Sequence, residues 1–363
     1  MATQTGITIE GPGKPYTVVD NIVRPTPGPN EALVKTLYVG LNPVDPIMHQ
    51  TGLLIQSFPA VTGSDFCAVV LSVGPETSKI SEGDIVIGCV PIGINEFSPF
   101  QESFLVNENW ILRTHTGDDA LDEKKLEQGA TVGAGLLTSG LGLTEGLKVE
   151  LPVSGSDKVL SKDEWLIVMG GSGSVGQFAV QLGKLGGYKV AASCSASKAA
   201  IAQKAGAEAT FDNRAPIDEQ LGMIERITGG GRFARVFDAS AQSSNLSLRA
   251  LDEIANTSSG AKYFSTVDDW SDIKTPQGIT TYRVQFGQLG KTSTPIGNEI
   301  TQKCEALVEL FQKHLVAGNL KPLDTYTVMD GQGWEALSQT LSGFEAGSLK
   351  IDGRKPVIKI ADI

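Results

Sequence analysis

The spacing of hydrophobic positions changes character along this chain. Up to about residue 110, short runs of β-forming residues at 31–37, 68–73 and 84–88 are separated by breakers such as 25–29 and 81–83. Runs of this length with proline, glycine and serine between them predict strands joined by tight turns. We therefore expect a compact, mostly β, barrel-like first domain, after which residues 126–147 form a helical stretch rich in small residues.

Beyond residue 160, apolar runs of strand length alternate with helical patterns. The predicted order is strand 165–169, helix 175–185, strand 188–194, helix 197–205, strand 208–212, helix 217–228, strand 234–238, helix 245–255 and strand 261–266. Such alternation implies a parallel sheet with right-handed crossovers. Residues 268–299 are irregular and polar, 300–317 form an amphipathic helix, and a last strand at 356–360 could return to the first domain.

A glycine-rich segment, Gly171 to Gly176, joins the first of these strands to the first helix. Gly171 allows a tight turn, Gly173 allows the backbone to approach a pyrophosphate, and Gly176 allows the helix to pack closely on the strand. The pyrophosphate would bind the unpaired N–H groups at the helix N-terminus. The alternative is a turn that binds no ligand. The flanking strand and helix favour the dinucleotide site.

The end of the next strand indicates which dinucleotide binds. An NAD site usually places an acidic residue there against the ribose hydroxyls, but this chain has Ser195, Ser197 and Lys198 instead. Two hydroxyls and a cation suit a 2′-phosphate, which favours NADPH. The alternative is that Ser197 caps a helix and Lys198 is a solvated lysine. Capping does not explain the missing carboxylate.

Composition limits the remaining possibilities. A chain of 363 residues is long enough for two domains, and 40% hydrophobic with 20% charged residues is typical of a globular protein. A net charge of −11 disfavours nucleic acid or an anionic membrane as the main partner. Met1 to Gly6 shows no signal-peptide pattern, so we expect a cytoplasmic protein. The four cysteines are scattered, as expected for reduced thiols, and Cys67 and Cys89 are expected to fill the core.

Several motifs resemble those of one superfamily, at residues 42–45 (NPxD), 63–68, 82–86, 129–140, 170–176, 206–208 and 211–214. Over nearly its full length the chain resembles the zinc-independent branch of the medium-chain dehydrogenase/reductase superfamily. The turn at 170–176 and the ending at 353–358 are most similar to fungal ToxD-like proteins and trans-acting enoyl reductases, which partner polyketide synthases. The resemblance implies an α/β fold, with a GroES-like, mostly β catalytic domain at 1–160, a Rossmann NADPH-binding domain at 161–315, and a return to the catalytic domain at 316–363.

The resemblance also implies the residues of the site. Those lining the nicotinamide end would be Pro43, Val44 and Asp45, with Thr266 and Val357 flanking the cofactor. The pyrophosphate would contact Gly171, Ser172, Gly173, Ser174 and Val175, and the 2′-phosphate Ser195, Ser197 and Lys198. The residues that would face the substrate are Thr138, Ser139, Gly140 and Leu289.

The chain departs from the subfamily pattern at three places. Pro46 and Ile47 stand where Trp-Lys usually follows the NPxD turn, and Asn213 stands where a tyrosine often packs beside the 2′-phosphate, so that NADPH affinity would depend more on Lys198. Cys67 replaces a common alanine. These departures leave an unusual substrate or an inactive protein open.

No metal site is expected. Catalytic zinc needs three Cys, His or carboxylate ligands, and zinc-dependent relatives place Cys and His-Glu where this chain has Asn42, Ser64 and Asp65. The solitary histidines His49, His115 and His314 are expected to be surface or packing residues.

Without a metal to polarise a ketone, a conjugated acceptor is the easier substrate, because charge from hydride addition delocalises onto its carbonyl oxygen. The first hypothesis is an NADPH-dependent enoyl reductase acting on a small or carrier-bound enoyl thioester, with a polyketide synthase as partner. A quinone or enone reductase with free substrates, and a non-catalytic NADPH-binding partner or sensor, are the alternatives. The proton would come from Tyr263, Thr138 or solvent, and the protein would be a monomer or homodimer.

Overall fold

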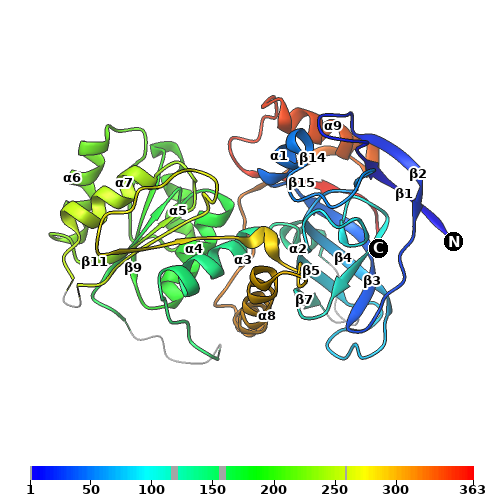
Figure 1. Cartoon of the computed structure of the whole chain (residues 1–363), viewed down its shortest axis with the longest axis horizontal. Coiled ribbons are helices and arrows are strands. Elements are labelled where there is room, and N and C mark those ends of the chain that lie inside the picture. The colour runs from blue at the N-terminus through cyan, green and yellow to red at the C-terminus, as the bar shows by residue number, and fades with distance from the viewer. Residues whose placement is uncertain (1, 116–121, 155–160, 258–259) are drawn as a thin grey trace. The chain divides into compact units, whose positions relative to one another are not determined.

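The computed structural model describes residues 2–115, 122–154, 161–257 and 260–363. The chain divides into two compact units (Figure 1). The first comprises Met1–Ala134, Gly287–Gln312 and Pro322–Ile363, and the second comprises Gly135–Phe286 and Lys313–Lys321. The units change within the helix Gly133–Leu141 and within α8 (Pro295–Val316), whereas the predicted domain boundaries lie after residues 160 and 315. Most of α8 belongs to the first unit, where Glu305 accepts a hydrogen bond from the Trp110 indole at 3.0 Å.

The second unit is built on a parallel sheet. Its strands are β8 (Trp165–Met169), β9 (Lys189–Cys194), β10 (Ala209–Asp212), β11 (Phe233–Asp238), β12 (Lys262–Thr266) and β13 (Ile279–Arg283), in the order β10-β9-β8-β11-β12-β13. Every pairing in this sheet is parallel. The strand order reverses direction at β8, and ligands of such sheets bind at the carboxyl ends of the strands beside this point.

Helices cover both faces of this sheet. They are α3 (Gly133–Leu141), α4 (Ser174–Leu185), α5 (Ala199–Ala205), α6 (Ile217–Thr228) and α7 (Ser244–Arg249). Within α4, Gly183 lies against Leu166 and Val190, whereas α6 and α7 pack on the opposite side chains of the same strands, such as Ile167 and Ala191. Strand residues that alternate between two buried faces explain the nearly continuous apolar runs in the sequence.

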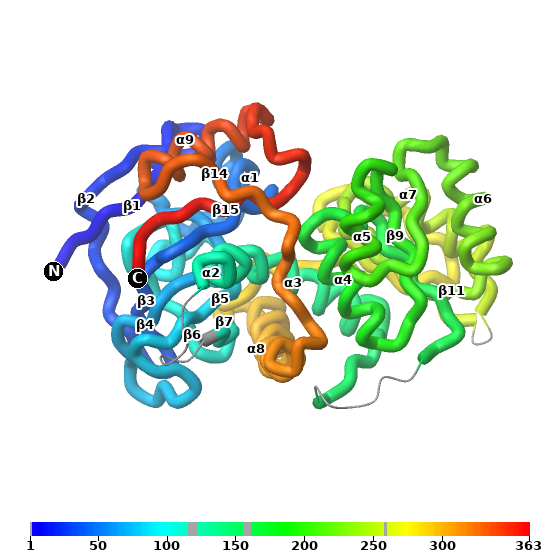
Figure 2. Tube along the Cα trace, turned by 180° about the vertical axis from the view of Figure 1, so that it is seen from behind, coloured from blue at the N-terminus to red at the C-terminus, as the bar shows by residue number. Residues whose placement is uncertain are grey.

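The first unit is mostly β. In its described residues the sheet order is β14-β15-β3-β4-β5-β7, and β6 also pairs with β3. The bounds are β3 (Glu31–Gly40), β4 (Asp65–Val73), β5 (Ile85–Cys89), β6 (Ser103–Asn107), β7 (Ile111–His115), β14 (Tyr326–Gln332) and β15 (Lys355–Lys359). Figure 2 shows β15, in red, beside β3, in blue, although they come from opposite ends of the sequence.

Strand β3 connects two parts of this core. Ala32 and Val34 pack with Phe66 and Phe104, while Val39, near the other end of the strand, packs with residues of β15 and helix α9 (Gly333–Glu345). The pairing of β3 with β4 shifts register between Thr36 and Tyr38, as at a β-bulge, and such a shift turns side chains toward the opposite face. One strand therefore serves two hydrophobic clusters.

Shorter elements complete the first unit: β1 (Thr3–Thr8), β2 (Thr17–Val23), α1 (Val44–Thr51) and α2 (Glu123–Gly129). Helix α1 is fixed to α9, because Nδ1 of His49 lies 2.9 Å from a Glu345 carboxylate oxygen. His49 also stacks on the Tyr16 ring, which confirms it as a packing residue.

The sequence misplaced some elements. The segment 268–299 was expected to be irregular, but it contains β13 and the start of α8. Strand β13 lies at the edge of the sheet, and its sequence, Ile-Thr-Thr-Tyr-Arg, shows no regular alternation of apolar and polar residues. The helical stretch at 126–147 is divided into α2, α3 and a π-helical turn, Gly142–Gly146. Part of the predicted loop 151–163 lies outside the described residues.

Candidate functional site

The glycine turn after β8 has the geometry that its sequence predicts. A Cβ on Gly176 would lie 2.1 Å from the carbonyl oxygen of Gly170, and one on Gly171 would lie 2.5 Å from the Ala192 Cβ. Both distances exclude a side chain, because real Cβ atoms do not approach so closely. A Cβ on Gly173 would meet only the Gly170 oxygen, at 3.5 Å. Gly173 therefore faces open space, which is what an approaching pyrophosphate requires.

The N-terminus of α4 carries no side-chain cap. Its N-cap residue is Gly173, and the first turn holds no acidic side chain. The first N–H groups of a helix have no partner inside the helix, and together with the helix dipole they attract anions. The residues of this turn thus fit a pyrophosphate group.

Three polar side chains hold this turn in place, and sequence reasoning did not assign them this role. The Ser193 hydroxyl accepts the N–H of Gly170 at 2.9 Å, and the Gln177 amide donates to the Ser172 oxygen at 3.0 Å. The buried Ser139 hydroxyl donates to the Val175 oxygen at 2.7 Å, so it fixes α3 to the first turn of α4. No local sequence signal marks such contacts, since two of them join residues more than twenty positions apart.

The residues predicted for a 2′-phosphate lie together at the end of β9. Ser195 and Ser197 have their hydroxyl oxygens 3.3 Å apart, and the Lys198 N–H donates to the Ser195 oxygen at 2.8 Å. Asn213 lies beside them, because its N–H donates to the Cys194 oxygen at 3.2 Å. Ser197 is exposed and Lys198 is half-buried. Ser197 does not cap α5, whose N-cap is Lys198.

Asp45 is a buried carboxylate in the first turn of α1. One of its oxygens accepts the N–H of Asn42 at 2.6 Å, and the other, Oδ1, has no hydrogen-bond partner in the described part of the protein. Burial raises the pKa of Asp45 to about 7. A buried acceptor without a partner is costly, so Oδ1 is suited to a hydroxyl or amide donor of a ligand. Pro43 and Val44 precede Asp45 in the same turn.

The other predicted residues are largely buried. Thr266 ends β12 and is fully buried, with its hydroxyl accepting the Asp268 N–H at 3.0 Å. Val357 and Leu289 are fully buried in the first unit, whereas Thr138 of α3 is half-buried and next to the buried Gly140 and Ser139. Tyr263 lies toward the amino end of β12, where Arg235 stacks on its ring. This end of the strand is opposite to the end that binds ligands, which argues against Tyr263 as a proton donor.

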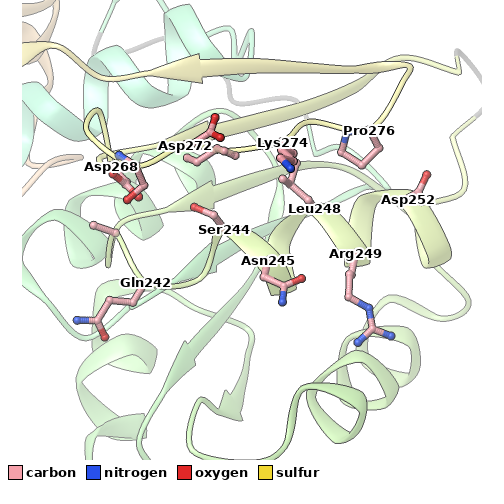
Figure 3. A pocket seen from close by; sticks show the side chains of 13 residues that line it. Gln242, Ser244, Asn245, Leu248, Arg249, Asp252, Asp268, Asp272, Lys274 and Pro276 are labelled. Carbon is pink, nitrogen blue, oxygen red and sulfur yellow. Dashed lines mark hydrogen bonds between the residues drawn. The ribbon is translucent and has the colours of Figure 1, made fainter.

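A pocket of about 530 Å³ opens in the second unit between α7 and the segment that follows β12. Figure 3 shows Ser244, Asp268, Asp272 and Lys274 around it, with Arg249 toward the right of the view. None of the predicted cofactor residues lines this pocket. The predicted cofactor residues therefore lie outside this hollow.

The described residues contain no group of three or more His, Cys, Asp or Glu side chains that could hold a metal ion. His314 is fully buried and its Nε2 lies 2.8 Å from the Pro152 oxygen, so it too is a packing residue. The side chain of His115 lies outside the described part of the chain. Cys67 and Cys89 are fully buried, as predicted, and no helix in the described ranges has the length and apolar character of a membrane span.

Comparison with known proteins shows to which sequences this chain is similar. Residues 28–115 match the alcohol dehydrogenase GroES-like domain family. The chain is 37% identical over 235 residues to the trans-enoyl reductase traG of Penicillium crustosum. The aligned region covers 62% of this chain and 61% of the length of traG. It is 30% identical over 282 residues to the trans-enoyl reductase cghC of Chaetomium globosum, covering 70% of this chain and 71% of that protein.

The fold is also that of solved reductases. The crystal structure of the CurK enoyl reductase superposes with a TM-score of 0.72 over 98% of this chain and 99% of its own, at 18% identity. The predicted fold class, a Rossmann unit with a GroES-like mostly β unit, is confirmed.

Proposed function

We propose that this chain, which belongs to the trans-enoyl reductase family of the medium-chain dehydrogenase/reductase superfamily, uses NADPH to reduce an activated carbon–carbon double bond. The expectation that it is an enzyme of this oxidoreductase family agrees with its relatives. The substrate would be a polyketide-type enoyl thioester, and the reaction would need no zinc.

The observation that carries this proposal is the open, uncapped N-terminus of α4. Gly173 leaves room for a phosphate oxygen to approach the backbone, and no side chain competes for the N–H groups of the first turn. Ser172, Ser174 and Val175 would hold the pyrophosphate there. Ser193 and Gln177 keep the turn rigid, so little order is lost when the anion binds.

The proposed preference for NADPH is supported by the end of β9. No carboxylate follows this strand directly, and Lys198 offers a cation beside the hydroxyls of Ser195 and Ser197. A phosphate accepts several charge-assisted hydrogen bonds, which these groups can donate. Asn213 would complete this group of side chains, because its backbone is bonded to Cys194.

NADPH would supply a hydride to the β carbon of the substrate, and a proton from Thr138 or solvent would add to the α carbon to complete the reduction. The residues of this chain then have three tasks: to hold the reactants, to exclude water, and to stabilise the charge on the thioester oxygen. Pro43, Val44 and Asp45 are proposed for the nicotinamide end, with Thr266 and Val357 beside them. Asp45 Oδ1 would form a hydrogen bond with the ligand there, which would satisfy this buried polar atom.

On the substrate side we assign Thr138, Ser139, Gly140 and Leu289. Thr138 is the half-buried hydroxyl among them and is proposed to donate to the substrate. The Ser139 hydroxyl already donates to backbone oxygens, so its contribution would be to fix α3. The proposed independence from zinc is supported by Asn42 and Asp65, whose oxygens are both taken by the ammonium group of Lys355.

The relatives traG and cghC are named trans-enoyl reductases, which supports a substrate carried by a separate synthase. We propose a polyketide synthase as that partner, and a cytoplasmic monomer or homodimer as the working form. The net charge of −11 requires a locally basic surface for docking of an acidic carrier protein.

Turnover assays test the proposal. Purified protein should oxidise NADPH in the presence of crotonyl or longer enoyl pantetheine thioesters and should leave quinones unchanged. Oxidation with quinones alone would assign the chain to the quinone and enone reductases. Tight NADPH binding in calorimetry without turnover of either panel would identify a non-catalytic NADPH-binding protein, and absence of binding would reject all three functions.

A further inference from the structure

A lysine is buried where three segments of the first unit meet. The Lys355 side chain is 1% exposed, and its Nζ lies 2.7 Å from Asp65 Oδ2 and 2.7 Å from Asn42 Oδ1. Asp65 is itself fully buried, and its other oxygen accepts the Ala134 N–H at 2.6 Å. One ammonium group thus connects β15 with the beginning of β4 and with the turn that follows β3.

The packing of β3 makes room for this side chain. Strands β15 and β3 pair with Val357 opposite Gly40. A Cβ on Gly40 would lie 2.6 Å from the Lys355 Cε and 2.1 Å from the Ala130 oxygen. The aliphatic part of Lys355 therefore fills the space that any other residue at position 40 would need.

Lys355 also determines the orientation of the Asn42 side chain. An ammonium group can only donate, so Asn42 must present its carbonyl oxygen to it. The Asn42 Nδ2 then donates to the Ser64 hydroxyl at 3.0 Å, and its backbone N–H donates to Asp45 at 2.6 Å. Each polar atom of Asn42 thereby gains a specific partner, and the turn from Asn42 to Asp45 is held in one conformation.

We propose that Lys355 is a positioning residue that fixes the turn at 42–45 and thereby the nicotinamide end of the cofactor site. This inference rests on the proposed function, in which Pro43, Val44 and Asp45 line that end. Lys355 supplies a cation to the amide oxygen of Asn42 and to the carboxylate of Asp65. In this chain the cation at these positions is part of the protein, so the turn is organised without a metal ion.

The test uses Lys355→Met and the double variant Lys355→Met/Asp65→Asn. The single change leaves a buried carboxylate without its counter-ion and should lower the Tm. The double change removes both charges and should restore the Tm, while Asn42 still lacks its donor. Lys359→Met is the matched control, because Lys359 lies on the same strand but forms its ion pair with Glu123 near the surface.

Hydrogen–deuterium exchange of the peptide covering 40–48 is the main measurement, made on the full chain without cofactor. In the double variant we expect exchange to be about tenfold faster than in the parent, with no change in Lys359→Met. In the same double variant, the fluorescence emission of bound NADPH should move toward that of free NADPH. The kcat should fall about tenfold. The Kd of NADPH should change little, because the phosphate contacts remain. A double variant with parental Tm, exchange and kcat would show that Lys355 only neutralises Asp65 and would overturn the proposal.

Asn42→Ala provides a second route, should the double variant not fold, because it leaves the ion pair of Lys355 and Asp65 intact. The same faster exchange at 40–48 is expected, and an unchanged rate would refute the inference. The exchange measurement does not depend on catalysis. If the parent protein turns over no enoyl thioester, the proposed function is rejected. If the variants still speed exchange at 40–48 in that case, the positioning role of Lys355 stands.

Discussion

Two alanine substitutions in the glycine turn should have different consequences, one mainly for stability and the other mainly for NADPH binding. The Gly176→Ala Cβ would lie 2.1 Å from the Gly170 oxygen and 2.7 Å from the Gly171 Cα, both of which are backbone atoms that cannot move aside. We expect a loss of stability of about 3 kcal/mol or more. Gly173→Ala has room for its methyl group and a φ of −76° that alanine adopts freely. Its loss at the N-cap should be about 1 kcal/mol.

The same Gly173→Ala methyl group occupies the space through which a pyrophosphate would reach the backbone. Losing one charge-assisted hydrogen bond costs about 1.5–3 kcal/mol, which corresponds to a rise of about 10- to 150-fold in the Kd of NADPH. Calorimetric titration with NADPH measures this effect, and thermal unfolding shows whether the fold is retained. If the Gly173→Ala variant folds and binds NADPH as tightly as the parent, the placement of the pyrophosphate is refuted. Gly176→Ala with the parental Tm would refute the close approach of α4 to the turn.

Three further variants test other parts of the site. Lys198→Ala should raise the Kd of NADPH about fivefold and leave that of NADH unchanged, because only the 2′-phosphate loses a partner, and equal effects on both would contradict this role. Ser193→Ala leaves the Gly170 N–H unpaired, so urea unfolding should show a loss of about 1–3 kcal/mol, and a parental unfolding midpoint would count against it. Asp45 has a folded-state pKa of about 7, raised by burial above the unfolded value of about 3.9. The folded protein therefore keeps a proton that the unfolded chain releases, and the free energy of unfolding should fall by up to about 4 kcal/mol as pH rises from about 4 to 7. Asp45→Asn should remove that decline in urea unfolding at pH 5 and pH 8, and an unchanged pH dependence in the variant would contradict the assignment.

The alternating segment and its glycine turn could be predicted because their physics is local. Strand, turn and helix follow each other within residues 165–185, and Gly176 is required by the backbone atoms of Gly170 and Gly171, a few positions away. Strand β8 and helix α6 have the predicted bounds for the same reason, since a buried strand and an amphipathic helix each carry their pattern within their own length. The edge strand β13 was missed because only one of its five residues, Ile279, is buried, so its sequence shows no clear alternation of apolar and polar positions.

What the sequence by itself determined is the fold and the local shape of the turns that follow β8 and β9, where we propose that a dinucleotide binds, because sterics and hydrogen bonding act there over short stretches of chain. Only the tertiary structure decided how the turn at 42–45 is held. Lys355 lies 313 positions from Asn42 and 290 from Asp65, and no pattern in the sequence relates them. A buried ammonium group must bind the acceptors that the packing places near it. For Lys355, those acceptors are set by the pairing of β15 with β3 and by the space that Gly40 leaves open.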